Sequence, residues 1–158
     1  RFELIQPMYS LVKRQAEVEI LPLAASEKIG VISYSPLGAG LLTGKYGINK
    51  RPDQGRLLEE ARYKDRYKDD NNFIIADKFS AYAEKHDVTP SSLAVAWVMS
   101  NPSVTAPIIG ARNIAQLQDS LGALDIKMTP EWREEISSLS NTPAPATDRA
   151  ETLLPNWK

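Results

Sequence analysis

The sequence predicts an α/β protein with parallel strands and, more narrowly, part of a (β/α)8 TIM barrel. Three times along the chain, a short apolar run is followed by a helix-like stretch, which is the pattern of parallel α/β proteins. A complete barrel takes about 250 residues, so this chain of 158 residues would supply about three of the eight units. A small doubly wound domain is the alternative, but the G-x-G-x-x-G turn of that fold is missing after the first strand. We therefore favour the barrel.

The first two strands and the helix between them lie near the N-terminus. Residues 2–6 form a strand-like run, and a helical pattern follows over about residues 17–28. The apolar face of this helix would be formed by Val18, Leu21, Ala25 and Ile29. Gly30 then ends the helix, as a residue past the C-cap often does. Residues 31–35, bounded by glycine and proline, predict the second strand, and a long polar loop is expected over residues 38–72.

Two helices are predicted beyond this loop. Helical spacing of apolar residues indicates the first one, with Ile75, Phe79, Tyr82 and Ala83. Thr89 and Pro90 are an N-cap and a proline at the first helical position, so the second helix begins there. Its apolar face would comprise Leu93, Ala94, Trp97 and Val98.

The third strand and two more helices complete the pattern. Residues 106–109 predict the strand, closed by Gly110, and Asn113 can cap the helix behind it. The buried stripe of that helix would be Ile114, Leu117 and Leu121. A last helix starts at Thr129, and the residues it would bury are Trp132, Ile136 and Leu139. The barrel portion therefore covers residues 1–140, and residues 141–158, with three prolines, are expected to be an extended tail.

Composition argues against several classes of function. The formal net charge is -1, from 19 basic and 20 acidic residues, so there is no electrostatic case for a nucleic-acid partner. Cysteine is absent, which removes disulfides and thiolate metal sites and fits a reducing compartment. The single histidine, His86, has no partner spaced for a metal. No apolar run approaches the roughly 18 residues of a membrane span, and residues 1–6 do not resemble a signal peptide. We expect a cytoplasmic protein without a metal or a membrane partner.

The start of the chain is unusual for a complete domain. It carries no initiator methionine and opens directly on the strand-like run, whereas natural domains usually begin with a polar lead-in. Two interpretations follow. The chain is either trimmed at its first residues or a piece of a larger domain, cut in mid-fold.

The end of the second strand could bind an anion. Residues 33–40 leave this strand through a proline and two glycines, so backbone N–H groups can approach a phosphate closely. Ser35 can add a hydroxyl donor. An ordinary Pro-Gly turn explains the same residues about as well.

The end of the third strand offers a second anion site. Residues 108–113 open a helix directly after the strand, where unpaired N–H groups and the helix dipole attract anions. Arg112 adds a planar donor fork suited to phosphate. Gln116 could instead complete a capping box with Asn113. Asp119 and Ser120, one turn further on, could be plain solvent-facing helix residues.

Four segments of the chain resemble the aldo-keto reductase family. Residues 6–11 (QPMYSL) look like the Gln-x-x-Tyr segment after its sixth strand, and residues 30–46 (GVISYSPLGAGLLTGKY) resemble its seventh-strand region. Residues 88–98 are similar to its G-V-T-P…L-A-L-A-W helix, and residues 107–117 resemble its eighth-strand cofactor motif. All four occur in the family's order and spacing, over roughly residues 2–125. The resemblance implies about the C-terminal half of a barrel, cut just before the sixth strand.

This resemblance implies a set of NADP(H)-binding residues. Tyr34 would stack on the nicotinamide, and Gln6 would hydrogen-bond its carboxamide. The pyrophosphate would be lined by Ser35, Pro36, Leu37 and Gly38. Lys45 and Arg56 would come from a loop that closes over the cofactor. The adenosine end would be surrounded by Gly110, Arg112, Gln116, Asp119 and Ser120, with Arg112 favouring the extra phosphate of NADP.

The resemblance also implies an enzyme that reduces a small aldehyde or ketone with hydride from NADPH. The family's catalytic Asp, Tyr, Lys and His come from the first half of the barrel, so no catalytic residue is expected in this chain. The alternative is a non-catalytic, redox-sensing subunit similar to the potassium-channel β subunits. A third hypothesis is a short or split gene product whose exposed sheet edges must pair with something. The sequence does not identify the substrate. It does not fix the oligomeric state either, and a homo-oligomer is possible.

Overall fold

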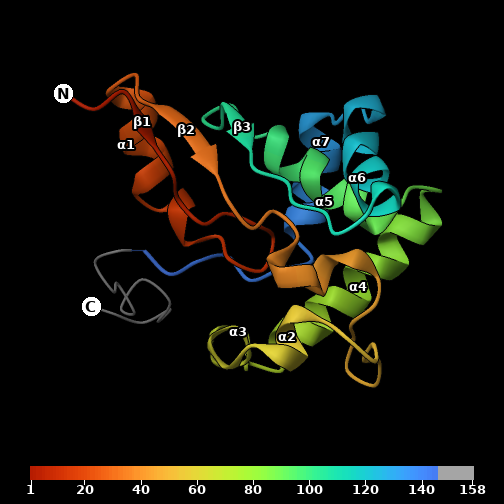
Figure 1. The fold of residues 1–158 in the computed structure, drawn as a ribbon. Coiled ribbons are helices and arrows are strands. Elements are labelled where there is room, and N and C mark those ends of the chain that lie inside the picture. Colours follow the sequence, from red (N-terminus) through yellow and green to blue (C-terminus); the bar gives the residue numbers. More distant parts are fainter. Residues whose placement is uncertain (146–158) are drawn as a thin grey trace, which may run out of the picture.

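Within residues 1–145, which the computed structural model describes, a parallel sheet of three strands organises the fold (Figure 1). β1 (Leu4–Ile5) pairs with β2 (Gly30–Ser33), and β2 pairs with β3 (Ala106–Pro107). Both pairings are parallel, and the order of the strands in space follows their order in the sequence. Helices lie between the strands along the chain. The predicted parallel α/β architecture is confirmed.

The outer strands are shorter than the sequence predicts. In place of strands over residues 2–6 and 106–109, β1 and β3 have two residues each. Backbone pairing nevertheless continues past β3, because the N–H of Ile108 donates to the carbonyl of Ser33 (2.7 Å). In the part of the chain that the structure describes, β1 and β3 each have a neighbour on one side only.

The predicted first helix is divided into two pieces. A 3₁₀ helix, η1 (Gln15–Glu17), precedes the α-helix α1 (Ile20–Ser26), where the sequence predicts one helix over residues 17–28. Pro22 lies in the first turn of α1, where its missing N–H needs no partner. In a helix continuing from residue 17, the ring of Pro22 would meet the carbonyl of residue 18. The break therefore follows from this proline.

A residue with left-handed backbone closes α1. Lys28 has a φ of 55°, and the N–H of Ile29 donates to the carbonyl of Ala24 (2.8 Å), which is the Schellman arrangement. The prediction that Gly30 lies just past the C-cap is wrong, since Gly30 is the first residue of β2. A Cβ atom at Gly30 would overlap the side chain of Leu4. Gly30 therefore belongs to the strand pairing, where a larger residue would have to displace the exposed end of the Leu4 side chain.

The segment over residues 38–72 is partly helical and not only a loop. Its elements are η2 (Gly38–Thr43), α2 (Arg56–Glu59) and α3 (Ala61–Arg66), followed by α4 (Asn71–Lys85). α2 and α3 are too short for apolar periodicity to reveal them in the sequence. Leu57 and Tyr67 are nevertheless buried and anchor this segment. Figure 1 shows α2 and α3 beside α4, away from the sheet.

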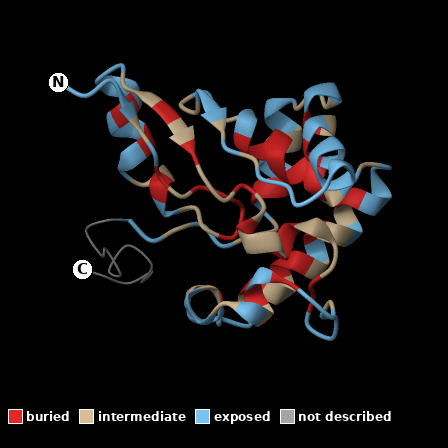
Figure 2. Cartoon of the chain, in the orientation of Figure 1, coloured by how far each residue is buried: buried red, intermediate tan, exposed pale blue. Residues whose placement is uncertain are grey.

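The core surrounds α5 (Pro90–Met99), as the buried residues in Figure 2 show. Its N-terminus forms as predicted: the Thr89 hydroxyl accepts from the N–H of Ser92 (3.2 Å), with Pro90 in the first turn. Residues 91–98 are all buried, beyond the one apolar face predicted, because α5 packs against α4, β3, η2, α6 (Ile114–Leu121) and η3 (Gly122–Asp125).

The predicted apolar face of α4 is largely confirmed. Ile75, Phe79 and Ala83 are buried, and Tyr82 is partly buried. These side chains belong to the same core cluster as Trp97 of α5. The 3.6-residue periodicity was therefore a sound guide where a helix has one face on the core.

The predicted buried stripe of α6 (Ile114–Leu121) is wrong. Ile114 is 75% exposed, and Leu117 and Leu121 are 40% and 45% exposed. The helix instead approaches α5 through small residues, because Ser120 is buried and a Cβ atom at Gly122 would overlap the Ser92 hydroxyl. The apolar stripe faces outward because no element among residues 1–145 covers it.

The described chain ends with η3 (Gly122–Asp125), α7 (Pro130–Ser137) and an irregular stretch. In α7, Ile136 is buried and Trp132 is partly buried, and Leu139, just beyond the helix, is partly buried too, close to the prediction. Of the predicted tail over residues 141–158, residues 141–145 have no helix or strand, and the remainder lies outside the described residues. Among the described helices, none has the length and apolar character needed to cross a membrane.

Candidate functional site

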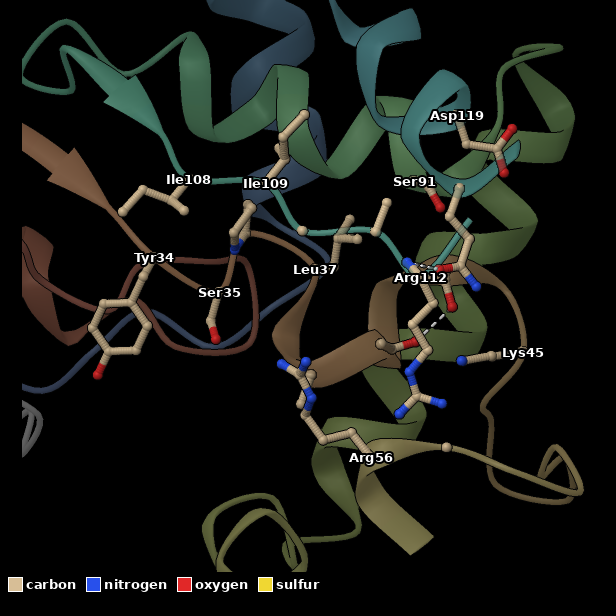
Figure 3. Close-up of a pocket in the computed structure, with 18 of the residues that line it drawn as sticks. Tyr34, Ser35, Leu37, Lys45, Arg56, Ser91, Ile108, Ile109, Arg112 and Asp119 are labelled. Atoms are coloured by element: carbon tan, nitrogen blue, oxygen red, sulfur yellow. Dashed lines mark hydrogen bonds between the residues drawn. The ribbon is translucent and has the colours of Figure 1, made fainter. Parts of the chain in front are cut away.

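A cavity of about 610 Å³ opens at the carboxyl ends of β2 and β3 (Figure 3). Parallel strands place the segments that follow them at the same edge of the sheet, which brings together residues far apart in sequence. Tyr34 and Ser35 follow β2, and Ile108 and Ile109 follow β3. The predicted residues that line the cavity are Tyr34, Ser35, Pro36, Leu37, Lys45, Arg56, Gly110, Arg112, Gln116 and Asp119.

Three cationic side chains converge on this cavity from separate segments. Lys45 follows η2, Arg56 begins α2, and Arg112 precedes α6. Figure 3 shows Lys45 and Arg112 pointing toward Arg56. Asp119 is the single carboxylate residue among the described residues that line the cavity. The lining therefore carries an excess of positive charge, which attracts an anionic ligand.

Aromatic rings hold two of these cations in place. The Lys45 ammonium lies 5.6 Å from the centre of the Tyr46 ring, and the Arg56 guanidinium lies 5.3 Å from the centre of the Tyr63 ring. At such distances the ring faces attract the cations. Tyr46 is buried, so its ring offers Lys45 a fixed support.

The turn after β2 is built from left-handed backbone. Ser35, Gly38 and Ala39 have φ values of 62°, 55° and 57°, and the N–H of Gly38 donates to the carbonyl of Ser35 (3.0 Å). Residues other than glycine adopt this conformation at a cost, and such residues concentrate at functional sites. The turn folds the chain back on itself, so that both Ser35 and Leu37 reach the cavity.

Tyr67 lies beneath this turn. Burial raises the pKa of its hydroxyl to about 12, and a hydrogen bond with Ser35 is among the weaker effects that oppose the shift. Its hydroxyl also lies 3.8 Å from the sulfur of Met8. Tyr67 is therefore a neutral group at ordinary pH and supports the turn from below.

The segment before α6 is closed by its own side chains. Gln116 accepts from the backbone N–H of Arg112 (2.9 Å), and Asn113 accepts from that of Gln116 (3.0 Å). The capping role that the sequence allowed for Gln116 is thus present, although its side chain reaches Arg112 and not the N-cap residue. Gln116 also lines the cavity.

Arg112 has an acidic neighbour across the cavity rim. One of its terminal nitrogens lies 3.5 Å from a carboxylate oxygen of Glu59, at the end of α2. The other oxygen of Glu59 accepts from the backbone N–H of Gly55 (3.0 Å). This ion pair connects the segment of α2 to the segment that follows β3.

Three of the predicted residues do not line the cavity. Gln6 is exposed beyond the end of β1, on the far side of β2 from β3. Gly38 is buried within the turn, where a Cβ atom would overlap a methyl group of Val12. Ser120 is buried in α6, and its hydroxyl donates to the carbonyl of Gln116 (3.1 Å).

Four residues that line the cavity were missed by sequence reasoning, namely Thr43, Gly55, Tyr63 and Ser91. Five others, Ala39, Gly40, Ile108, Ile109 and Ala111, lie within the two segments predicted to bind an anion. Ser91 is the most informative, because it lies in the first turn of α5, which the sequence suggested only as a core helix. A polar residue in the first turn of an otherwise apolar helix was the one feature of the sequence that could have indicated a place at the cavity. Tyr63 lay in the loop predicted over residues 38–72, and no local signal placed its side chain at the cavity.

Fold and cavity together define a parallel α/β protein with a ligand site at the carboxyl ends of its strands. The family model "Aldo/keto reductase family" matches residues 1–141, and the chain belongs to this family. It is 34% identical over 149 residues to "Uncharacterized oxidoreductase YrpG" of Bacillus subtilis (strain 168), covering 92% of this chain and 42% of that protein. It is 35% identical over 132 residues to "Probable aldo-keto reductase 1" of Glycine max, covering 84% of this chain and 38% of that protein. The chain thus spans about two fifths of the length of these relatives.

Proposed function

We propose that this chain is the cofactor-binding half of an NADP(H)-dependent carbonyl reductase. The observation that carries the proposal is the convergence of Lys45, Arg56 and Arg112 on one cavity, next to Tyr34. In α/β barrels the active face is this end of the strands, and phosphate commonly binds the loops after the last two strands. The printed names of the two relatives, an oxidoreductase and a probable aldo-keto reductase, agree with this chemistry.

The cavity suits a dinucleotide with a further phosphate. Its volume of about 610 Å³ falls within the roughly 300–1,000 Å³ of small-molecule sites. Tyr34 offers a ring at one end, and the guanidinium of Arg112 lies at the other (Figure 3). Open space surrounds the position of a Cβ atom at Gly110, so a ligand can approach the backbone there. This arrangement supports nicotinamide beside Tyr34 and the ribose 2′-phosphate beside Arg112.

In this proposal the chain's residues bind and orient the cofactor. NADPH supplies hydride to the carbonyl carbon of a small aldehyde or ketone. Lys45 and Arg56 neutralise the pyrophosphate, and Ser35 adds a hydroxyl donor at the strand end. Gln6, Gly38 and Ser120 lie outside the cavity lining and would act only through a shift of the chain or as support. The proton donor would come from the Asp, Tyr, Lys and His set, which the family resemblance places in the first half of the barrel.

We also propose that the sheet is an arc of a (β/α)8 barrel. A doubly wound sheet reverses its strand order at one point. The spatial order β1-β2-β3 shows no such reversal. Both outer strands have apolar residues that are exposed in the described chain, such as Leu4 at 55% and Ile108, just beyond β3, at 41%. Further strands on either side would cover them. The relatives are longer than this chain, which is consistent with such neighbours.

Cofactor titration and turnover test the proposed function. The intact protein is titrated with NADPH and NADH, followed by nucleotide fluorescence, and then assayed for NADPH oxidation with a generic aldehyde. Saturable NADPH binding with aldehyde-dependent oxidation is expected. Failure to bind either nucleotide refutes the proposal. Binding without turnover, in a protein with the full catalytic set, favours the redox-sensing alternative.

A further inference from the structure

The ion pair between Glu59 and Arg112 has a consequence for cofactor choice. Arg112 is the cation proposed to meet the ribose 2′-phosphate, and its guanidinium already faces the carboxylate of Glu59 at 3.5 Å. A phosphate and a carboxylate are both anions that bind the same N–H groups of a guanidinium. The two groups therefore compete for one partner.

We propose that Glu59 is a specificity-determining residue, which competes with the 2′-phosphate of NADP for Arg112 and so limits the preference for NADP over NAD. The proposal rests on the proposed function. NAD has a hydroxyl at the same ribose position and needs no exchange of ionic partners. Glu59 should therefore weaken the binding of NADP selectively.

The geometry of the pair favours exchange over permanent pairing. The two side chains are 60% and 47% exposed, and one nitrogen meets one oxygen, without the two parallel bonds of a bidentate pair. Exposed single contacts of this kind contribute little to stability. An incoming phosphate, with a larger negative charge, can therefore displace the carboxylate.

Glu59 keeps its position when Arg112 leaves. Its second carboxylate oxygen accepts from the N–H of Gly55 (3.0 Å). Because Gly55 is the residue just before α2, this bond holds the Glu59 side chain back along the helix toward its first turn. The negative charge thus stays near the phosphate after the exchange. Both effects, competition and repulsion, act against NADP and spare NAD.

The substitution Glu59→Gln separates the charge from the structural role. A glutamine oxygen can still accept from the N–H of Gly55, while the negative charge disappears. We expect NADP⁺ to bind roughly three- to fivefold more tightly and NAD⁺ to change by less than about twofold. The measurement is the dissociation constant of each nucleotide for the intact protein, by calorimetry.

Two further variants make the test decisive. Asp65→Asn removes one negative charge from α3, where Asp65 pairs with Lys68 (3.0 Å) outside the cavity lining, and should leave both constants unchanged. In an Arg112→Ala background, Glu59→Gln should lose most of its effect, because the competed partner is gone.

The outcomes distinguish this proposal from the one on which it rests. If the unsubstituted protein binds neither nucleotide, the proposed function fails. If it binds NADP⁺ but Glu59→Gln leaves the NADP⁺-to-NAD⁺ ratio unchanged, only the role of Glu59 is overturned. Weaker binding of both nucleotides would also overturn it, since Glu59 would then be closing the site.

Discussion

Arg112 is the residue on which the cofactor preference should depend most. Its proposed partner, the 2′-phosphate, is present in NADP and absent from NAD. We expect Arg112→Ala to weaken NADP⁺ binding by about 1.5 kcal/mol, roughly tenfold, because charge-assisted hydrogen bonds are lost. Binding of NAD⁺ should change far less. Dissociation constants for both nucleotides check this, with Lys64→Ala as a control outside the cavity lining. Equal losses for the two would contradict the assignment.

Two glycines of the predicted cofactor set should respond differently to alanine. Gly38 has a φ of 55°, and a Cβ atom there would overlap Val12, so Gly38→Ala should lower the free energy of unfolding by about 1–3 kcal/mol. Gly110 has open space around the same position, so Gly110→Ala should stay within about 0.5 kcal/mol. Urea unfolding of the two variants is the measurement. A loss at residue 38 as small as the one expected at residue 110 would show that the turn tolerates a side chain there.

Residues next to strand ends were predictable, and residues brought by folding were not. Tyr34 and Arg112 lie within a few residues of predicted strands, so their place at one edge followed from the parallel pattern. Ser91 and Glu59 reach the same region through helices that no local pattern directs there. Gly30 was misassigned because a glycine after a helix has two uses, and only the position of Leu4 separates them.

At the scale of elements, two helices end on a left-handed residue that is not glycine. These residues are Lys28 after α1 (φ 55°) and Asp87 after α4 (φ 54°). Both helices end in the same Schellman arrangement. Lys28→Gly should raise the free energy of unfolding by about 1 kcal/mol, because glycine adopts this conformation without strain. Asp87→Gly should gain less, about 0.5 kcal/mol, since aspartate tolerates the conformation better.

Thermal unfolding of the two variants, compared with the unsubstituted protein, measures these gains. Substitution of exposed Lys78 by glycine, inside α4, serves as the control and should destabilise. If Lys28→Gly proved neutral or destabilising, contacts of the lysine side chain would have to offset the strain energy of the left-handed backbone at residue 28.

Helix prediction succeeded or failed according to what covers each helix. The faces of α4 and α7 were predicted well because each has one side on the core of the described chain. The stripe of α6 was predicted from the same periodicity, yet it is exposed. Periodicity shows that a face is apolar, but it does not show which partner buries it.

At the scale of the whole molecule, several large apolar side chains are exposed within residues 1–145. Phe2 is 65% exposed, Leu23 of α1 59% and Ile114 of α6 75%. We expect the 158-residue chain, produced alone, to self-associate and to bind a hydrophobic dye, because open edges and apolar patches promote association. Sedimentation velocity over a range of concentrations checks this. A monomer without dye binding would contradict the exposure of these surfaces.

The three cations of the cavity come from segments that are far apart in the chain. Lys45, Arg56 and Arg112 are joined in space only by tertiary packing and by the weak contact through Glu59. A bound polyanion would connect them directly, so its binding energy would add to the folding energy of the region. At a concentration one hundred times its dissociation constant, such a ligand stabilises the folded state by about 2.7 kcal/mol. The nucleotide would therefore act as a removable cross-link, and the protein's resistance to heat and proteolysis would follow the supply of its own cofactor.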